Sequence, residues 1–318
     1  MLLPSSILWN FIIFFIFKVK FAESVTSEVS GISKLVNSIE RMEDKRLERL
    51  ISRYNCEHFY VDMGTNIGVQ IRKVYQAEKY PGALALPVFD QYFGPGRRCN
   101  VCSIGFEPNP SHRAHLYALQ ERFNNAGIGV LIFFGAANTH TGVLKYGTKS
   151  KKVDKKQDWG GSVVQASNSK LGQSYFRSVR SIDVARIIRT LDSHLRNQRR
   201  GSRVSSKIVM KSDIEGSEFT VFPHLLFTNT ICSIDFLFAE WHERSFRPRE
   251  STKVRNLDHT GDWEIFNYTV DIKTFFNSQF SQHFSKSCPT VFSDIDDETY
   301  RDDKTEFTPE ILCRARKY

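Results

Sequence analysis

Acidic residues and glycines gather at several places in this sequence where an apolar run ends. At the first of them, Asp62 is followed by Gly64, Asn66 and Gly68 in the segment VDMGTNIG. A glycine lets the backbone approach a ligand closely, and a carboxylate attracts a cationic or amino group. The segment lacks the GxGxxG spacing that brings backbone amides to a pyrophosphate. It therefore favours a cofactor without a phosphate bridge.

A second carboxylate, Glu107, ends the apolar run VCSIGF, and Asn109 follows two residues later. In nucleotide-binding folds an acidic residue at a strand end accepts hydrogen bonds from the ribose hydroxyls. Glycine turns and strand-end carboxylates are each common on their own. In this order, each at the end of a strand, they indicate a cofactor that carries an adenosyl group.

Carboxylates are densest in MKSDIEGSEF, which contains Asp213, Glu215 and Glu218. Acidic side chains near a helix N-terminus are stabilised by the helix dipole, and this accounts best for Glu218. Asp213 ends an apolar run on the side where a ligand would bind. We therefore predict that Asp213 acts as a general base.

One more polar cluster, which includes Glu240 and His242, stands at the end of the apolar run 233–241. These side chains could position a hydroxyl group or bind a divalent metal, whereas a histidine at a strand end is also commonly a hydrogen-bonded structural group. We predict that Glu215 or His242 positions the acceptor and that no metal is resident. A metal-assisted mechanism using Asp213, Glu240 and His242 is the alternative.

Strands must hold these clusters in place. Apolar runs predict five strands, at residues 58–64, 101–108, 129–135, 207–213 and 233–241. Helices are predicted at residues 69–76, after Pro110 and at residues 181–200. Near-continuous apolar strands are typical of a parallel sheet covered by helices on both faces. We therefore predict an α/β fold with a doubly wound, mostly parallel sheet, in which ligands bind beyond the carboxyl ends of the strands.

The N-terminus carries an apolar run at residues 7–17, interrupted only by Asn10. It is shorter than the roughly 20 residues of a spanning helix and resembles the apolar region of a signal peptide. No Lys or Arg precedes it and Ala22 is the small residue nearest to a cleavage point, so a short uncleaved anchor is the alternative. Either segment directs the chain to the secretory pathway.

The predicted organisation has three parts. Residues 1–22 form the signal peptide or anchor, residues 23–54 an amphipathic helical stem, and residues 55–318 the main domain. Two segments interrupt the alternation of strands and helices in the main domain. Residues 77–98 are rich in Pro and Gly, and residues 146–173 are basic and rich in Gly and Ser, which predicts insertions, the second as a loop or a hairpin.

The six cysteines are an even number, as expected of a disulfide-bonded chain in an oxidising compartment. Cys99 and Cys102 form a CxxC motif. However, a zinc site needs a second pair at ligand spacing, and a redox dithiol normally opens a helix. Structural disulfides are therefore favoured. The sequon that starts at Asn267 predicts a glycoprotein.

The chain has 318 residues, 41% of them hydrophobic and 25% charged, which excludes collagen-like, disordered and multi-span membrane proteins. The net charge of +9 is concentrated at residues 145–211, which contain 17 Lys and Arg but 4 Asp and Glu. This segment favours an anionic partner. A nucleic acid partner is disfavoured, because the chain carries a secretory signal and lacks an aromatic and basic binding module.

Four segments, VDMGTNIG, IGFEPNPSH, SVRSIDVARI and MKSDIEGSEF, together resemble the FkbM-type family of S-adenosylmethionine-dependent methyltransferases over residues 59–242. The resemblance implies a Rossmann-like, seven-stranded class I methyltransferase fold and transfer of a methyl group, mainly to hydroxyl oxygens. It implies S-adenosyl-L-methionine as cofactor, bound by Asp62, Gly64, Asn66, Gly68, Glu107, Asn109 and Ala137. Asp213 and Glu215 match the acidic pair of the family.

The sequence departs from the family pattern between Asp62 and Glu107. These residues lie farther apart than the roughly 20 residues usual in a compact βαβ unit, and the insertion at residues 77–98 accounts for the difference. The predicted acceptor is a hydroxyl of a glycan or a small secreted molecule. The alternative is a non-catalytic lumenal binding protein that keeps the fold, and the intact acidic and glycine motifs argue against it.

Overall fold

A computed structural model describes residues 28–54, 56–96, 98–148, 161–163, 175–199, 205–246, 260–284 and 286–297. The predicted signal peptide or anchor, residues 1–22, lies outside these ranges. The chain divides into two units, Met1–Lys45 and Arg46–Tyr318. Among the described residues, no helix has the length and apolar character needed to cross a membrane.

The first unit contains the beginning of helix α2 (Glu28–Arg53), where Leu35 and Met42 are exposed. The last turns of α2 belong to the second unit, and Leu47 and Leu50 are buried in its core. The role of the N-terminal helix as a stem stays a prediction.

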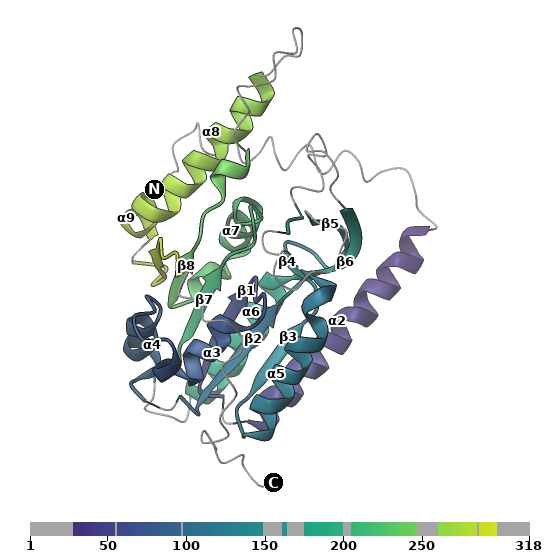
Figure 1. Cartoon of the computed structure of the whole chain (residues 1–318). Coiled ribbons are helices and arrows are strands. Elements are labelled where there is room, and N and C mark those ends of the chain that lie inside the picture. The colour runs from purple at the N-terminus through teal and green to yellow at the C-terminus, as the bar shows by residue number, and fades with distance from the viewer. Residues whose placement is uncertain are drawn as a thin grey trace. The chain divides into compact units, whose positions relative to one another are not determined.

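The second unit is built on a six-stranded sheet with the order β3-β2-β1-β7-β8-β9, in which all neighbouring strands are parallel (Figure 1). The strands are β1 (His58–Met63), β2 (Val101–Phe106), β3 (Val130–Phe133), β7 (Ile208–Ser212), β8 (Phe236–Ala239) and β9 (Val291–Ser293). All five predicted strands are present and buried. The resemblance implies a sheet of seven strands, and the described residues form six strands in this sheet.

Helices cover both faces of the sheet, as predicted for a doubly wound fold. One face packs against α3 (Val69–Tyr75), α4 (Leu86–Phe93) and α5 (Arg113–Asn125). The other packs against the end of α2, α6 (Val184–Arg199), α7 (Glu218–Phe227), α8 (Thr260–Thr274), the π-helix Phe275–Gln279 and α9 (Phe280–Phe284). Short 3-10 helices lie at Ala77–Lys79, Pro110–His112, Ile231–Ser233 and Glu243–Phe246.

The strand order reverses between β1 and β7, which places the switch point of the sheet at their carboxyl ends. Met63, the last residue of β1, is in register with Phe106 of β2 and Ser212 of β7. The three acidic motifs that follow these strands therefore meet at one edge of the sheet. Ligands of open parallel sheets bind at this position.

The insertion at residues 77–98 forms structure rather than a bare loop. Its helix α4 contributes Phe89 and Phe93 to the buried core. A buried ion pair between Lys73 Nζ and Asp297 Oδ1, at 3.0 Å, joins α3 to the end of the described chain. Asp297 also accepts a hydrogen bond from the N–H of Ala85, so one carboxylate holds α3 and the insertion together.

A second, three-stranded sheet of order β4-β6-β5 adjoins the carboxyl edge of the first. It contains β4 (Ala136–Asn138), β5 (Gly142–Thr148) and β6 (Tyr175–Asp183), and β5 and β6 are antiparallel. The predicted helix at residues 181–200 therefore starts three residues late, because Ser181 to Asp183 end a strand. The Asp183 carboxylate accepts the N–H groups of Ala185 and Arg186 and so begins α6. Of residues 149–174, only 161–163 are described.

Two disulfides join distant parts of the second unit, Cys56 to Cys102 and Cys232 to Cys288. Cys99 is disulfide-bonded as well, and no described cysteine is free. Because Cys102 is bonded to Cys56, the CxxC motif is neither a redox dithiol nor a zinc ligand pair. The prediction of structural disulfides is confirmed.

We expect the double substitution Cys56→Ser and Cys102→Ser to lower the free energy of unfolding by about 2 to 4 kcal/mol, since the bond closes a long loop and limits the unfolded chain. Urea denaturation of the oxidised protein and of the variant measures the difference. An unchanged midpoint would show that this disulfide contributes nothing to stability.

Candidate active site

A pocket of about 810 Å³, including its open part, lies at the carboxyl ends of β1, β2 and β7. Six of the ten predicted site residues line it: Gly64, Asn66, Glu107, Ala137, Asp213 and Glu215. Loops after three strands supply five of the six, and Ala137 comes from β4. The structure therefore brings together motifs that are far apart in the sequence.

Gly64 lies directly against the backbone of Asp213. Its φ of +83° is rare for other residues, and a Cβ atom here would collide with the carbonyl oxygen of Asp213. The N–H of Asp213 donates to the carbonyl of Met63 at 3.0 Å, and the N–H of Gly64 donates to the carbonyl of Phe106 at 3.1 Å. Any side chain at position 64 would separate the first and third motifs.

Glu107 holds the first and second motifs together. Its carboxylate accepts the N–H of Asn66 at 2.6 Å on one oxygen and the N–H of Asn109 at 2.8 Å on the other. Asn109 itself is absent from the pocket lining, and its side chain caps the next helical turn by accepting the N–H of Ser111. Glu107 is thus both a wall of the pocket and the link between two loops.

Asp62 and Gly68 lie behind the pocket wall instead of lining it. Gly68 has a φ of +87° at the start of α3, and a Cβ atom there would collide with Leu119, so it serves packing. Asp62 is fully buried, and neither carboxylate oxygen has a hydrogen bond partner in the described part of the chain. Burial raises the pKa of Asp62 to about 7, although the nearby Lys211 ammonium opposes the shift.

Lys211 is a site residue that the motif analysis missed. Its buried ammonium donates to Asp213 Oδ2 at 2.8 Å and so fixes the direction of this carboxylate. Lys211 is also in register with Asp62 on the neighbouring strand. The sequence carries a signal for this residue. Lys211 precedes Asp213 by two residues in a strand, so the two side chains lie on the same face of the strand, where Lys211 is a charged residue in an otherwise apolar layer.

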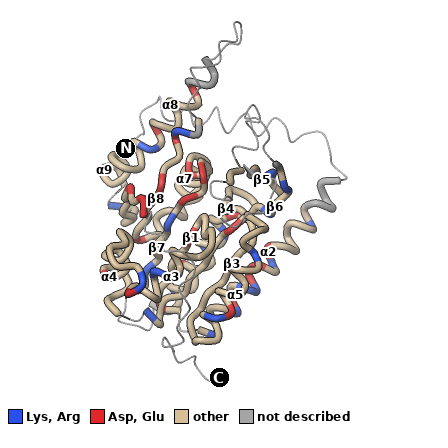
Figure 2. The backbone as a smooth tube through the Cα atoms, viewed as in Figure 1, with Lys and Arg blue, Asp and Glu red and all other residues tan. Residues whose placement is uncertain are grey.

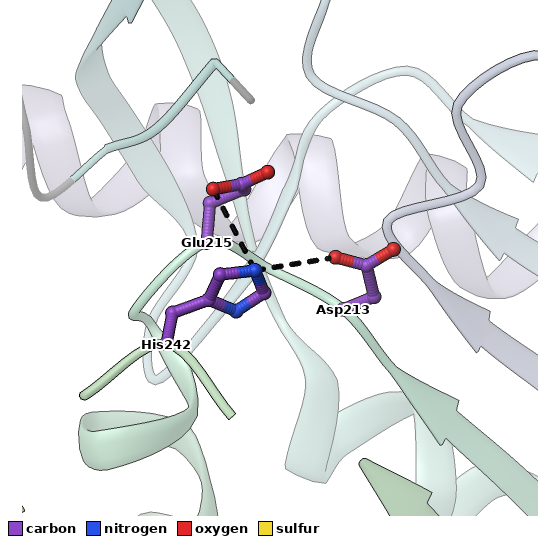
Figure 3. Close-up of side chains that lie close together, drawn as sticks. All are labelled: Asp213, Glu215 and His242. Carbon is purple, nitrogen blue, oxygen red and sulfur yellow. Dashed lines mark ion pairs between the residues drawn. The ribbon is translucent and has the colours of Figure 1, made fainter. Parts of the chain in front are cut away.

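Four carboxylates surround the imidazole of His242, and Figure 3 shows two of them, Asp213 and Glu215. Nδ1 lies 3.2 Å from Glu218 Oε1, and Nε2 lies 3.4 Å from Glu240 Oε1. Nε2 is also 3.7 Å from Glu215 Oε2 and 3.9 Å from Asp213 Oδ1. The ring therefore bridges the loops after β7 and β8, although His242 does not line the pocket.

This environment determines the charge of His242. Burial alone would lower its pKa, but hydrogen bonds to Glu218 and Glu240, together with the charges of Glu218 and Glu215, raise the pKa to about 11. The ring is therefore an imidazolium at neutral pH and does not act as a base. Burial also raises the pKa of Glu215, while the positive charge of His242 opposes this shift.

Glu218 shapes the loop from which Asp213 and Glu215 project. It is fully buried at the start of α7 and accepts the N–H groups of Ile214 at 2.8 Å and Gly216 at 2.7 Å. These bonds accompany a left-handed backbone at Glu215, with φ of +53°. The interpretation of Glu218 as a residue of the helix N-terminus is consistent with this contact, and the bond to His242 extends it.

A family model described as the methyltransferase FkbM domain matches residues 62–278. The chain belongs to the FkbM methyltransferase family. No curated protein and no solved structure matches it. The matched segment contains every predicted site residue, from Asp62 to His242, so the family and the fold class predicted from the sequence are confirmed.

The pocket of this FkbM methyltransferase combines apolar walls with buried polar groups. Apolar groups from Phe106, Ala136 and Ala137 line one part of it, where a base could pack. Among the described residues, Asn66 Oδ1 and both ring nitrogens of His112 are buried without a hydrogen bond partner. Buried polar groups normally have partners, so this unused capacity fits a ligand.

The hairpin β5–β6 supplies a wall that sequence motifs did not reveal. Tyr146, Gly161 and Val163 line the pocket, and Gly147 and Ser162 form a backbone bridge. The hydroxyl of Ser162 donates to the carbonyl of Glu215 at 2.6 Å. The second insertion of the FkbM domain therefore contacts the acidic loop directly.

Asp213, Glu215 and His242 also have the composition of a divalent-cation site, with ligand atoms within 4.8 Å of one another. A cation would compete with the proton on Nε2, because a ligating imidazole must be neutral at that nitrogen. The protonation state of His242 Nε2 therefore tests the metal-assisted alternative.

We expect the His242 ring to stay doubly protonated at pH 8 and to be unaffected by EDTA or by millimolar Mg²⁺, since its pKa of about 11 lies far above this pH. NMR of the ring nitrogens measures the protonation state. A neutral ring, or a ring that loses its proton when Mg²⁺ is added, would favour the metal-assisted mechanism.

The buried carboxylate of Asp62 should lower the free energy of unfolding at high pH. Its pKa is about 7 in the folded chain and lower when unfolded, so its favourable contribution is present at low pH and is lost as the pH rises through 7. We expect the stability of Asp62→Asn relative to the wild type to increase by about 1 to 3 kcal/mol from pH 5 to pH 9, because the folded carboxylate ionises within this range.

Urea denaturation at the two pH values measures this difference. A variant whose stability relative to the wild type is the same at pH 5 and pH 9 would contradict the shifted pKa of Asp62.

Proposed function

We propose that this FkbM methyltransferase is an S-adenosylmethionine-dependent O-methyltransferase of the secretory pathway that methylates a hydroxyl of a glycan or a small secreted molecule. The observation that carries the proposal is the convergence of Gly64, Glu107 and Asp213 on one pocket at the switch point of the sheet. Disulfides between distant parts of the chain support an oxidising compartment.

The cofactor would be held between the loops after β1 and β2. S-adenosylmethionine supplies an electrophilic methyl group on a positively charged sulfur. Glu107 would accept a hydrogen bond from the ribose, and Ala137 would contact the adenine. The carboxylates of Asp213 and Glu215 give this part of the pocket a negative charge, which favours a cation over a neutral product.

The acceptor hydroxyl would bind beside Asp213. Lys211 occupies Oδ2 of this residue, whereas among the described residues Oδ1 has only the distant contact with His242 at 3.9 Å. Oδ1 is therefore the oxygen that can take the proton of the hydroxyl. Glu215 would orient the hydroxyl, and the imidazolium of His242 would hold both carboxylates in place. In this proposal His242 is a positioning residue.

The second sheet supports an acceptor with negative charge elsewhere in the molecule. Figure 2 shows Lys and Arg on β5 and β6, and Asp and Glu around α7 and the end of β8. Lys145 is exposed, and Arg177 and Arg180 are half-buried. An acceptor could place its anionic group against this basic hairpin and its hydroxyl at Asp213. Membrane attachment, in this proposal, involves only the N-terminal segment.

The test is to incubate the purified, oxidised chain with methyl-labelled S-adenosylmethionine and fractions of a secretory-compartment extract. We expect a labelled product whose methyl group resists mild alkali, as an ether does and a methyl ester does not. Omission of the enzyme is the control. Binding of the cofactor without any labelled product in any fraction would favour the non-catalytic alternative.

Asp213→Asn should reduce turnover about 10²- to 10⁴-fold, the usual contribution of a general base, because the amide cannot accept the proton. The affinity for S-adenosylhomocysteine, which lacks the positive charge on sulfur, should change little, since the backbone contact with Gly64 remains. Initial rates and calorimetric titration measure the two effects. Turnover close to that of the wild type would exclude Asp213 as the base.

A further inference from the structure

We infer that His112 is a cofactor-binding residue that shares with Glu107 the recognition of a ribose diol. The inference rests on the proposed S-adenosyl cofactor and adds a residue that neither the sequence motifs nor the family match assigns. It is carried by the burial, the position and the unused hydrogen bonding capacity of this one side chain.

His112 ends the 3-10 helix Pro110–His112, between the loop after β2 and helix α5. The side chain capping by Asn109 fixes this turn. His112 is only 6% exposed, yet it lines the pocket together with Glu107 and Asn66. The backbone therefore holds the imidazole at the pocket wall, away from bulk solvent.

Neither ring nitrogen of His112 has a hydrogen bond partner in the described part of the chain. Leaving a buried polar group unpaired is unfavourable, so such groups usually have a partner in the functional state. His115, one turn later, is different, because its Nε2 contacts the carbonyl of Ile67 at 3.1 Å. A purely structural histidine would be expected to resemble His115.

Glu107 offers a ribose diol only hydrogen bond acceptors. Each of its oxygens already accepts one backbone N–H, and a carboxylate offers acceptors only. A hydroxyl that donates to Glu107 keeps an oxygen that can accept a hydrogen bond. His112 Nδ1 lies 3.4 Å from Glu107 Oε1, so in the tautomer that carries its proton on Nδ1 a donor lies beside this acceptor. Acceptor and donor together match two adjacent hydroxyls.

The experiment titrates the full oxidised chain with S-adenosylhomocysteine and with its 2′-deoxy and 3′-deoxy analogues by calorimetry. The variants are His112→Phe, which keeps a ring and removes both nitrogens, and His283→Phe as the matched control. His283 is exposed on α9 and belongs to no site described above. Thermal melting of each unliganded variant checks that it is folded.

We expect His112→Phe to bind S-adenosylhomocysteine about 10-fold more weakly, equivalent to one lost hydrogen bond of about 1.4 kcal/mol, while His283→Phe binds like the wild type. At least one deoxy analogue should bind the wild type more weakly and lose this penalty in His112→Phe. That loss of discrimination separates direct recognition from a general disturbance of the pocket.

Unchanged affinity in His112→Phe, or a deoxy penalty that persists in full, would overturn the inference and leave the proposed function intact. If His112→Phe does not fold, the same comparison with His112→Leu, which also removes both nitrogens, decides between the same outcomes. A folded wild-type chain that binds no S-adenosylhomocysteine would overturn the proposed function and the inference with it.

Discussion

The site depends on the close approach of two backbone segments, the turn at Gly64 and the end of β7 at Asp213. No side chain fits between them, and the hydrogen bond from Asp213 N–H to the Met63 carbonyl continues the β1–β7 pairing to this point. This approach brings the glycine turn and the acidic loop to one pocket. Glu107 then ties the third loop to the same turn through Asn66.

Charge is the second constraint on this pocket. Carboxylates at positions 213, 215, 218 and 240 lie around two cations, the buried ammonium of Lys211 and the half-buried imidazolium of His242. Each cation fixes a carboxylate in direction, and the acidic excess remains available to a positively charged ligand. Asp62 adds a buried carboxylate with a raised pKa behind the turn. Such a concentration of perturbed groups in a cleft is typical of functional sites.

The sequence predicts the sheet well because its strands are nearly continuous apolar runs, and it predicts Gly64, Glu107 and Asp213 because each follows such a run. It fails where the position depends on tertiary contacts. Its spacing from Asp213 indicates Lys211 only weakly, whereas the neighbourhood of Lys211 and Asp62 and the burial of His112 follow from the tertiary structure. Asp62, Gly68 and Asn109 were expected at the ligand, but burial, packing and capping place them behind the wall.

In the proposed function, three loops, each following a different strand, form one cofactor pocket. Hydrogen exchange of the oxidised chain with and without S-adenosylhomocysteine tests this claim most directly. We expect the ligand to slow hydrogen exchange in all three loops, at residues 64–70, 107–115 and 213–218. Protection confined to one of these loops, or located away from the carboxyl edge of the sheet, would contradict it.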